Sequence, residues 1–133
     1  MNWAALITWV LTAGGGFALL ALWLKGGGMS QQGGGRIRSA RILSHFALAA
    51  IGLVLWIVYV ASGSSTVAWI AFALLLVVAL IGFSMLAIWL AQRKRRETAA
   101  AEQRFPAAIV GLHGVLAATT LVLVFLAAAG IGS

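Results

Sequence analysis

The sequence predicts an all-α membrane protein, a four-transmembrane-helix bundle built from two tandem helical hairpins in a parallel pseudo-twofold arrangement. Of the 133 residues, 63% are hydrophobic and only 8% are charged, whereas about a quarter of the residues of a soluble domain are charged. Four apolar runs are each long enough to cross the hydrocarbon core as a helix, and none contains Asp, Glu, Lys or Arg. We therefore expect one transmembrane domain over 1–133.

The four expected spans follow these charge-free runs. The first run has no basic segment ahead of it and is too long for a signal peptide, so we expect it to remain as a helix. Only 62–66 separates the second run from the third, which makes these two helices antiparallel neighbours. Pro106 is expected to begin the fourth. The predicted spans cover about 3–24, 42–61, 67–91 and 107–131.

All nine Lys and Arg residues lie in two connecting segments, 25–41 and 92–106, and the chain carries a net charge of +7. Under the positive-inside rule both segments are cytoplasmic loops of a multi-pass protein, and both termini lie outside. The positive net charge is explained by the orientation of the protein in the lipid bilayer, so no nucleic acid partner is expected. The glycine-rich stretch 26–35 predicts a flexible tether, and the Ala-rich stretch 92–104 predicts a helical extension of the third span.

The two halves of the chain resemble each other. A shift of 66 residues places the first span on the third and aligns Gly16 with Gly82. A shift of 68 residues places the second span on the fourth and aligns His45 with His113. Trp, Gly-Phe and His matches are informative because these residue types are scarce, so they indicate a tandem duplication. Each unit has two spans, so both copies share one orientation around an axis along the membrane normal.

His45 and His113 are the only histidines, and no Asp, Glu, Lys or Arg accompanies them within the spans. The repeat places them at similar depth on opposite sides of the predicted axis. Two imidazoles so arranged can supply both axial ligands of a haem b iron, and four-helix bundles commonly hold haem. Two histidines without a third ligand make a poor zinc or copper site.

Further residues are predicted around this haem site by their position relative to the histidines. Small residues on the histidine faces would leave space for the edge of the macrocycle, and cations near the cytoplasmic rim would meet the propionates. The small residues are Gly52 and Thr120, and the cations are Arg38, Arg41 and Arg104.

One function that the sequence allows is a haem protein for electron transfer or haem holding. The sequence also allows a second function. A histidine in a membrane helix can hydrogen-bond a neighbouring carbonyl, and small residues there commonly mark close helix packing. The alternative is a non-catalytic structural or accessory subunit of a larger membrane complex, or a homo-oligomer. A metal ion or a quinone at the histidines also remains open. The absence of Cys excludes thiol chemistry, and no catalytic residue is assigned.

The chain also resembles a known group of proteins. The stretch His45–Trp56, together with 105–106, 113–114 and 120–123 near and within the fourth span, is similar to small uncharacterised four-helix inner-membrane proteins of GC-rich bacteria. The resemblance covers most of the chain and implies a bacterial inner membrane, but it implies no activity. In architecture alone, the predicted bundle is similar to four-helix haem b membrane cytochromes.

Overall fold

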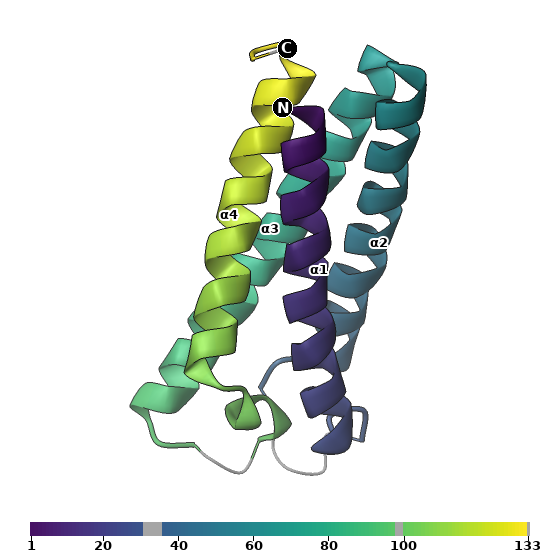
Figure 1. Ribbon diagram of the computed structural model, residues 1–133. Helices are drawn as coiled ribbons and strands as arrows, with labels where there is room; N and C mark the ends of the chain where they lie inside the picture. The colour runs from purple at the N-terminus through teal and green to yellow at the C-terminus, as the bar shows by residue number, and fades with distance from the viewer. Residues whose placement is uncertain (31–35, 98–99, 133) are drawn as a thin grey trace.

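The computed structural model describes residues 1–30, 36–97 and 100–132. These ranges form four long helices that run up and down beside one another, with both chain termini at the same end (Figure 1). All four helices are long and apolar enough to cross a membrane, which confirms the predicted all-helical fold with four candidate spans. The elements are α1 (Asn2–Lys25), α2 (Ser39–Ser62), α3 (Ser65–Lys94), the 3-10 helix η1 (Ala101–Arg104) and α4 (Ala107–Ala128).

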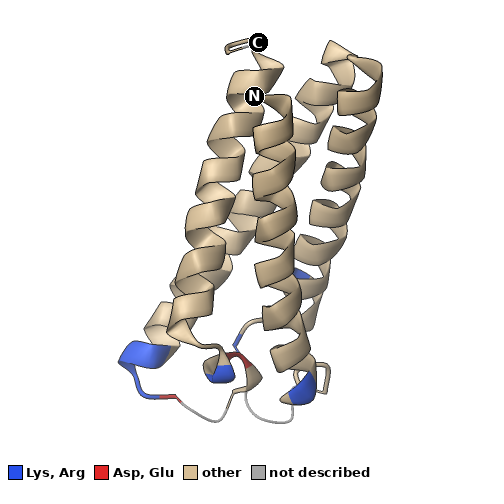
Figure 2. Cartoon of the chain, in the orientation of Figure 1, with Lys and Arg blue, Asp and Glu red and all other residues tan. Residues whose placement is uncertain are grey.

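The bundle has two unlike ends. Every Lys and Arg lies toward one end, which we call the basic end (Figure 2). The opposite end, here the terminal end, carries both termini and the short turn between α2 and α3 (Figure 1). Large apolar side chains are exposed on the outer faces of all four helices, as expected where helices contact lipid instead of water. Examples are Val10, Val54, Leu80 and Val115.

The turn between α2 and α3 explains why these helices are antiparallel neighbours. Gly63 ends α2 in the left-handed conformation, with φ 70°, and its N–H donates to the Tyr59 carbonyl at 2.8 Å. A residue without Cβ adopts this conformation without steric cost. Ser64 then caps α3, because its hydroxyl accepts from the Val67 N–H at 3.5 Å. The short connection predicted for 62–66 therefore has a local cause.

The predicted helical extension of the third span through 104 is wrong. Helix α3 ends at Lys94, Arg96 has a positive φ of 58°, and the Glu97 N–H returns to the Gln92 carbonyl at 3.0 Å. The chain then folds back, and η1 lies against α1 and α3. The fourth helix also ends earlier than expected, at Ala128, before the left-handed Gly130. Part of the predicted tether, residues 31–35, lies outside the described residues.

Buried side chains gather in two separate zones. At the terminal end, all four helices contribute to a packed cluster that we call the terminal-end core. Its members are Ala5, Trp9, Trp56, Ala68, Ala71, Leu75, Val124 and Ala127. At the basic end, the loops and helix ends form a second zone, the basic-end cap. Its buried members include Trp23, Ile37, Trp89, Gln92, Ala101 and Glu102.

Between these two zones lies a stretch in which no described residue is fully buried. It covers 13–22, 42–51, 79–88 and 107–119 on the four helices, and we call it the histidine layer because it contains both histidines. Helix α1 packs mainly on α4, and α2 packs mainly on α3. Each helix pair contributes one histidine to this layer, His113 from α4 and His45 from α2.

Candidate functional site: a histidine pair inside the bundle

The two predicted ligands lie together. His45 comes from α2 and His113 from α4, and their ring centroids are 6.3 Å apart with an interplanar angle of 69°. These helices are far apart in the chain, so tertiary packing brings the rings together. The sequence expectation that both histidines occupy a similar depth on facing helices agrees with this arrangement.

Each imidazole is held by a backbone carbonyl of the helix beside it. His45 Nδ1 lies 3.0 Å from the carbonyl oxygen of Val78 on α3, and His113 Nδ1 lies 2.9 Å from that of Thr12 on α1. A carbonyl only accepts, so Nδ1 donates in both contacts. In a neutral imidazole the other nitrogen, Nε2, then carries the lone pair. Metal-binding histidines are commonly oriented in this way.

A glycine exposes each of these carbonyls. In a helix a side chain covers the turn that precedes it, so the residue four positions after a carbonyl would normally shield it. That position is Gly82 for Val78 and Gly16 for Thr12. A Cβ at Gly82 would lie 3.0 Å from His45 Cε1, and a Cβ at Gly16 would lie 3.1 Å from His113 Cε1. The two glycines therefore admit the two rings.

The remaining ring nitrogens are free of hydrogen bonds within the described part of the chain. No hydrogen bond joins Nε2 of His45 or His113 to any described residue. The buried side-chain polar atoms without a partner in these ranges are Trp23 Nε1 and Glu102 Oε2, and neither Nε2 is among them. The histidine Nε2 atoms are therefore not sealed inside packed protein, which leaves them available to a ligand.

The small residues predicted near the histidines lie deeper in the bundle and are packed. Gly52 is buried, and a Cβ there would lie 3.0 Å from Trp9 Cζ2. Thr120 is also buried; its hydroxyl donates to the Leu116 carbonyl at 2.7 Å and lies 3.1 Å from the Thr12 hydroxyl. These two residues form the boundary between the histidine layer and the terminal-end core, and both positions are filled by neighbouring side chains.

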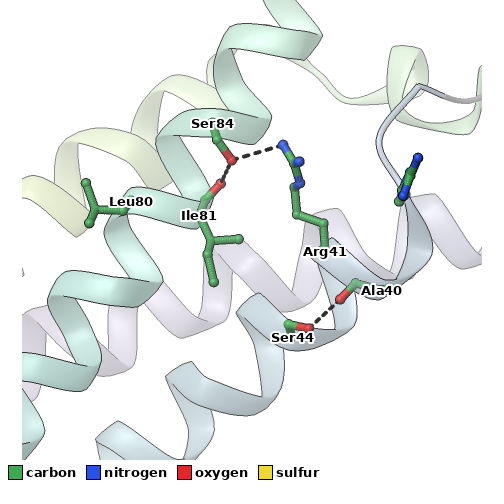
Figure 3. A pocket seen from close by; sticks show the side chains of 7 residues that line it. Ala40, Arg41, Ser44, Leu80, Ile81 and Ser84 are labelled. Atoms are coloured by element: carbon green, nitrogen blue, oxygen red, sulfur yellow. Dashed lines mark hydrogen bonds between the residues drawn. The ribbon is translucent and has the colours of Figure 1, made fainter.

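The predicted cations all lie at the basic end but do not form one group. Arg38 and Arg41 line an open groove of about 510 Å³ between α2 and α3, where Arg41 Nη1 donates to Ser84 Oγ at 3.2 Å (Figure 3). Arg104 is exposed on η1. Neither histidine lines this groove.

Sequence reasoning missed the buried acid of the basic-end cap. Glu102 is completely buried, and its Oε1 accepts the N–H groups of Arg36 at 3.0 Å and Ile37 at 3.3 Å. The same oxygen accepts from Gln92 Nε2 at 3.0 Å, and the Glu102 carbonyl accepts from Trp89 Nε1 at 2.9 Å. Glu102 thus ties the segment before α2 to the end of α3. An acid isolated in an Ala-rich stretch was the available signal.

A surface ion pair lies beside this buried acid. Arg36 Nε contacts Glu97 Oε2 at 2.7 Å, and Arg95 approaches the other oxygen at 3.7 Å. The hydrogen bond from Arg36 holds the pKa of Glu97 below its ordinary value. This pair joins the same two segments from the outside.

The histidine pair offers two imidazole nitrogens to a ligand. Among the described residues, no group of three or more His, Cys, Asp or Glu side chains could hold a metal ion. Two imidazoles are too few for a closed zinc site, but they are the number of axial positions that a haem iron offers. Comparisons with protein-family models, with curated proteins and with solved structures found no match to this chain.

Proposed function

We propose that this chain is a small haem b protein of the membrane, with His45 and His113 as axial ligands of the iron. The observation that carries the proposal is the close approach of the two imidazoles, which come from α2 and α4. Imidazole nitrogens lie about 2 Å from first-row metals, so two rings on opposite faces of one iron have centroids roughly 6 Å apart. The separation of 6.3 Å between the two rings agrees with that requirement.

The backbone contacts determine which ring nitrogen would bind the iron. The Val78 and Thr12 carbonyls fix the orientation of the two rings and direct the lone pair to Nε2. The haem, when bound, supplies redox chemistry for electron transfer, and the chain holds and orients it. Of the three arginines expected at the propionates, Arg104 remains the candidate, because Arg38 and Arg41 line a separate groove that neither histidine lines.

We infer that a tandem duplication produced the two histidine contacts. Shifts of 66 and 68 residues, which relate the halves of the sequence, also relate one contact to the other. His45 contacts Val78 and Gly82. The shift of 68 residues relates His45 to His113, and the shift of 66 residues relates Val78 and Gly82 to Thr12 and Gly16, which His113 contacts. A pseudo-twofold axis along the membrane normal accounts for both contacts with one local arrangement. The basic loops favour an orientation with both termini outside, and the resemblance to small four-helix inner-membrane proteins favours the inner membrane of a bacterium.

A second candidate is a structural or accessory membrane subunit in which the histidines only join helices. The observation in its favour is that each Nδ1–carbonyl hydrogen bond already bridges two helices, α2 to α3 and α4 to α1. Such bonds stabilise membrane bundles by about 1 kcal/mol each. In this case Nε2 has no ligand and the protein has no cofactor.

A visible absorption spectrum separates the two candidates. The chain is expressed with ample haem supply and purified in mild detergent, and one haem per chain with a reducible Soret band is expected. His45→Gln and His113→Gln keep an N–H donor for the carbonyls but remove the imidazole, so each should lose the band while circular dichroism stays helical. Thr119→Ala on exposed α4 surface is the matched control. A colourless, folded wild-type protein contradicts the haem proposal.

A further inference from the structure

A groove at the basic end lies between the start of α2 and the second half of α3 (Figure 3). It has a volume of about 510 Å³, and its lining residues divide into a polar rim and an apolar floor. The rim consists of Arg38, Arg41, Ser44 and Ser84, and the floor includes Leu80 and Ile81. Leu80 is 63% exposed, so the floor opens to the outside of the bundle, where a membrane protein contacts lipid.

We propose that this groove binds one anionic phospholipid, with its phosphate at Arg38 and Arg41 and an acyl chain along Leu80 and Ile81. A guanidinium carries five N–H donors in a planar fork that matches phosphate oxygens. Arg41 uses one of its nitrogens on the neutral Ser84 hydroxyl at 3.2 Å, which leaves further donors for an anion. Basic pockets between membrane helices are known to bind lipid headgroups.

The protein itself does not neutralise these two cations. The chain contains two acidic residues. Glu97 is paired with Arg36 and Arg95, and Glu102 accepts backbone and amide N–H groups in the basic-end cap. Arg38 and Arg41 therefore keep their full charge at the mouth of the groove. An anion supplied from the bilayer is the complementary partner.

The groove belongs to one helix pair only. The shift of 68 residues aligns Arg41 with Ile109, and the shift of 66 residues aligns Ser84 with Ala18. The other helix pair, α1 with α4, therefore lacks the polar rim. A general attraction between basic loops and anionic lipid would not require a polar rim on one helix pair only, and it would bind several lipid molecules. A specific site at this groove predicts a single bound lipid molecule.

Native mass spectrometry of the detergent-purified chain tests the proposal with phosphatidylglycerol and phosphatidylcholine as probes. We expect one phosphatidylglycerol per chain at low lipid concentration and weaker binding of phosphatidylcholine. Arg41→Gln should weaken phosphatidylglycerol binding roughly tenfold, as expected for loss of a charged hydrogen-bond donor. Ser84→Ala frees Arg41 without changing charge and should retain the single bound lipid.

Lys94→Gln is the matched control, because it removes one positive charge at the same end but outside the groove. It should change the affinity less than twofold. Equal weakening by Arg41→Gln and Lys94→Gln, or a ladder of several equivalent bound lipids, overturns the specific site in favour of general charge attraction. Displacement of the lipid by millimolar inorganic phosphate alone overturns the lipid assignment. None of these outcomes depends on haem, so the test is independent of the proposed function.

Discussion

The terminal-end core and the histidine layer are built from the same four helices in opposite ways. In the core, large side chains meet on the axis, with the rings of Trp9 and Trp56 6.4 Å apart and Leu75 and Val124 buried beside them. In the histidine layer, no described residue is fully buried. The helices there are joined by two ring-to-carbonyl hydrogen bonds and by an edge contact between the rings of Phe17 and Phe46, whose centroids are 5.3 Å apart.

This difference indicates where the bundle derives its stability. Between membrane helices, close packing provides most of the stabilisation, because lipid is as apolar as the side chains themselves. A core at one end can hold four helices together while a less packed layer remains at another depth. Four predictions test this division, from the largest expected effect to the smallest.

Trp56→Ala should destabilise the bundle most, by about 3 kcal/mol or more, because it empties the centre of the terminal-end core. The side chain is completely buried, and its Nε1 donates to the Asn2 carbonyl at 3.3 Å. Unfolding in detergent by added denaturant measures the change. Trp3→Ala removes the same atoms from a side chain that is 67% exposed, and it should have little effect. Equal losses in the two variants would remove the distinction between core and surface.

Glu102→Ala should have the next largest effect, about 1–3 kcal/mol, because it leaves buried N–H donors without an acceptor. The Arg36 and Ile37 amides both point to Glu102 Oε1. Hydrogen exchange should therefore rise at these two amides and stay unchanged within the terminal-end core. Unchanged exchange at Arg36 and Ile37 would mean that the cap does not hold the segment before α2.

Gly82→Ala should destabilise the histidine layer by about 1–2 kcal/mol, because the new Cβ forces the His45 ring away from the Val78 carbonyl. Gly111→Ala, in the same layer of α4, is the control. A Cβ at Gly111 meets no atom within 4 Å, so helix propensity should make that change neutral or stabilising. Thermal unfolding of both variants checks the sign; the same sign in both would contradict the role given to Gly82.

The smallest effect is expected for the Glu97 ion pair at the surface. Its hydrogen bond with Arg36 lowers the folded-state pKa of Glu97 below the ordinary value of 4.5. Stability from this group is therefore fully present above pH 4.5 and is lost as the pH falls through the folded-state value. Glu97→Gln should flatten the decline of the unfolding temperature below pH 4.5 and leave it nearly unchanged at pH 7. An identical acid profile in both proteins would assign the pair no role in stability.

The sequence was sufficient for features that depend on local patterns. Charge-free runs located the four helices, and the proposed repeat predicted that the two histidines lie at a similar depth. The end of α3 and the burial of Glu102 could not be read in this way, because both depend on contacts between segments that are distant in the chain. The same holds for the acceptors of the histidines, because a backbone carbonyl has no sequence signal.

The absorption spectrum of the purified protein, with the haem content measured per chain, tests the central proposal most directly. The account predicts one haem per chain, a Soret band that shifts on reduction, and loss of that band in both His45→Gln and His113→Gln proteins that remain helical. A helical wild-type protein that stays colourless after expression with excess haem, or a band that survives both substitutions, would contradict it.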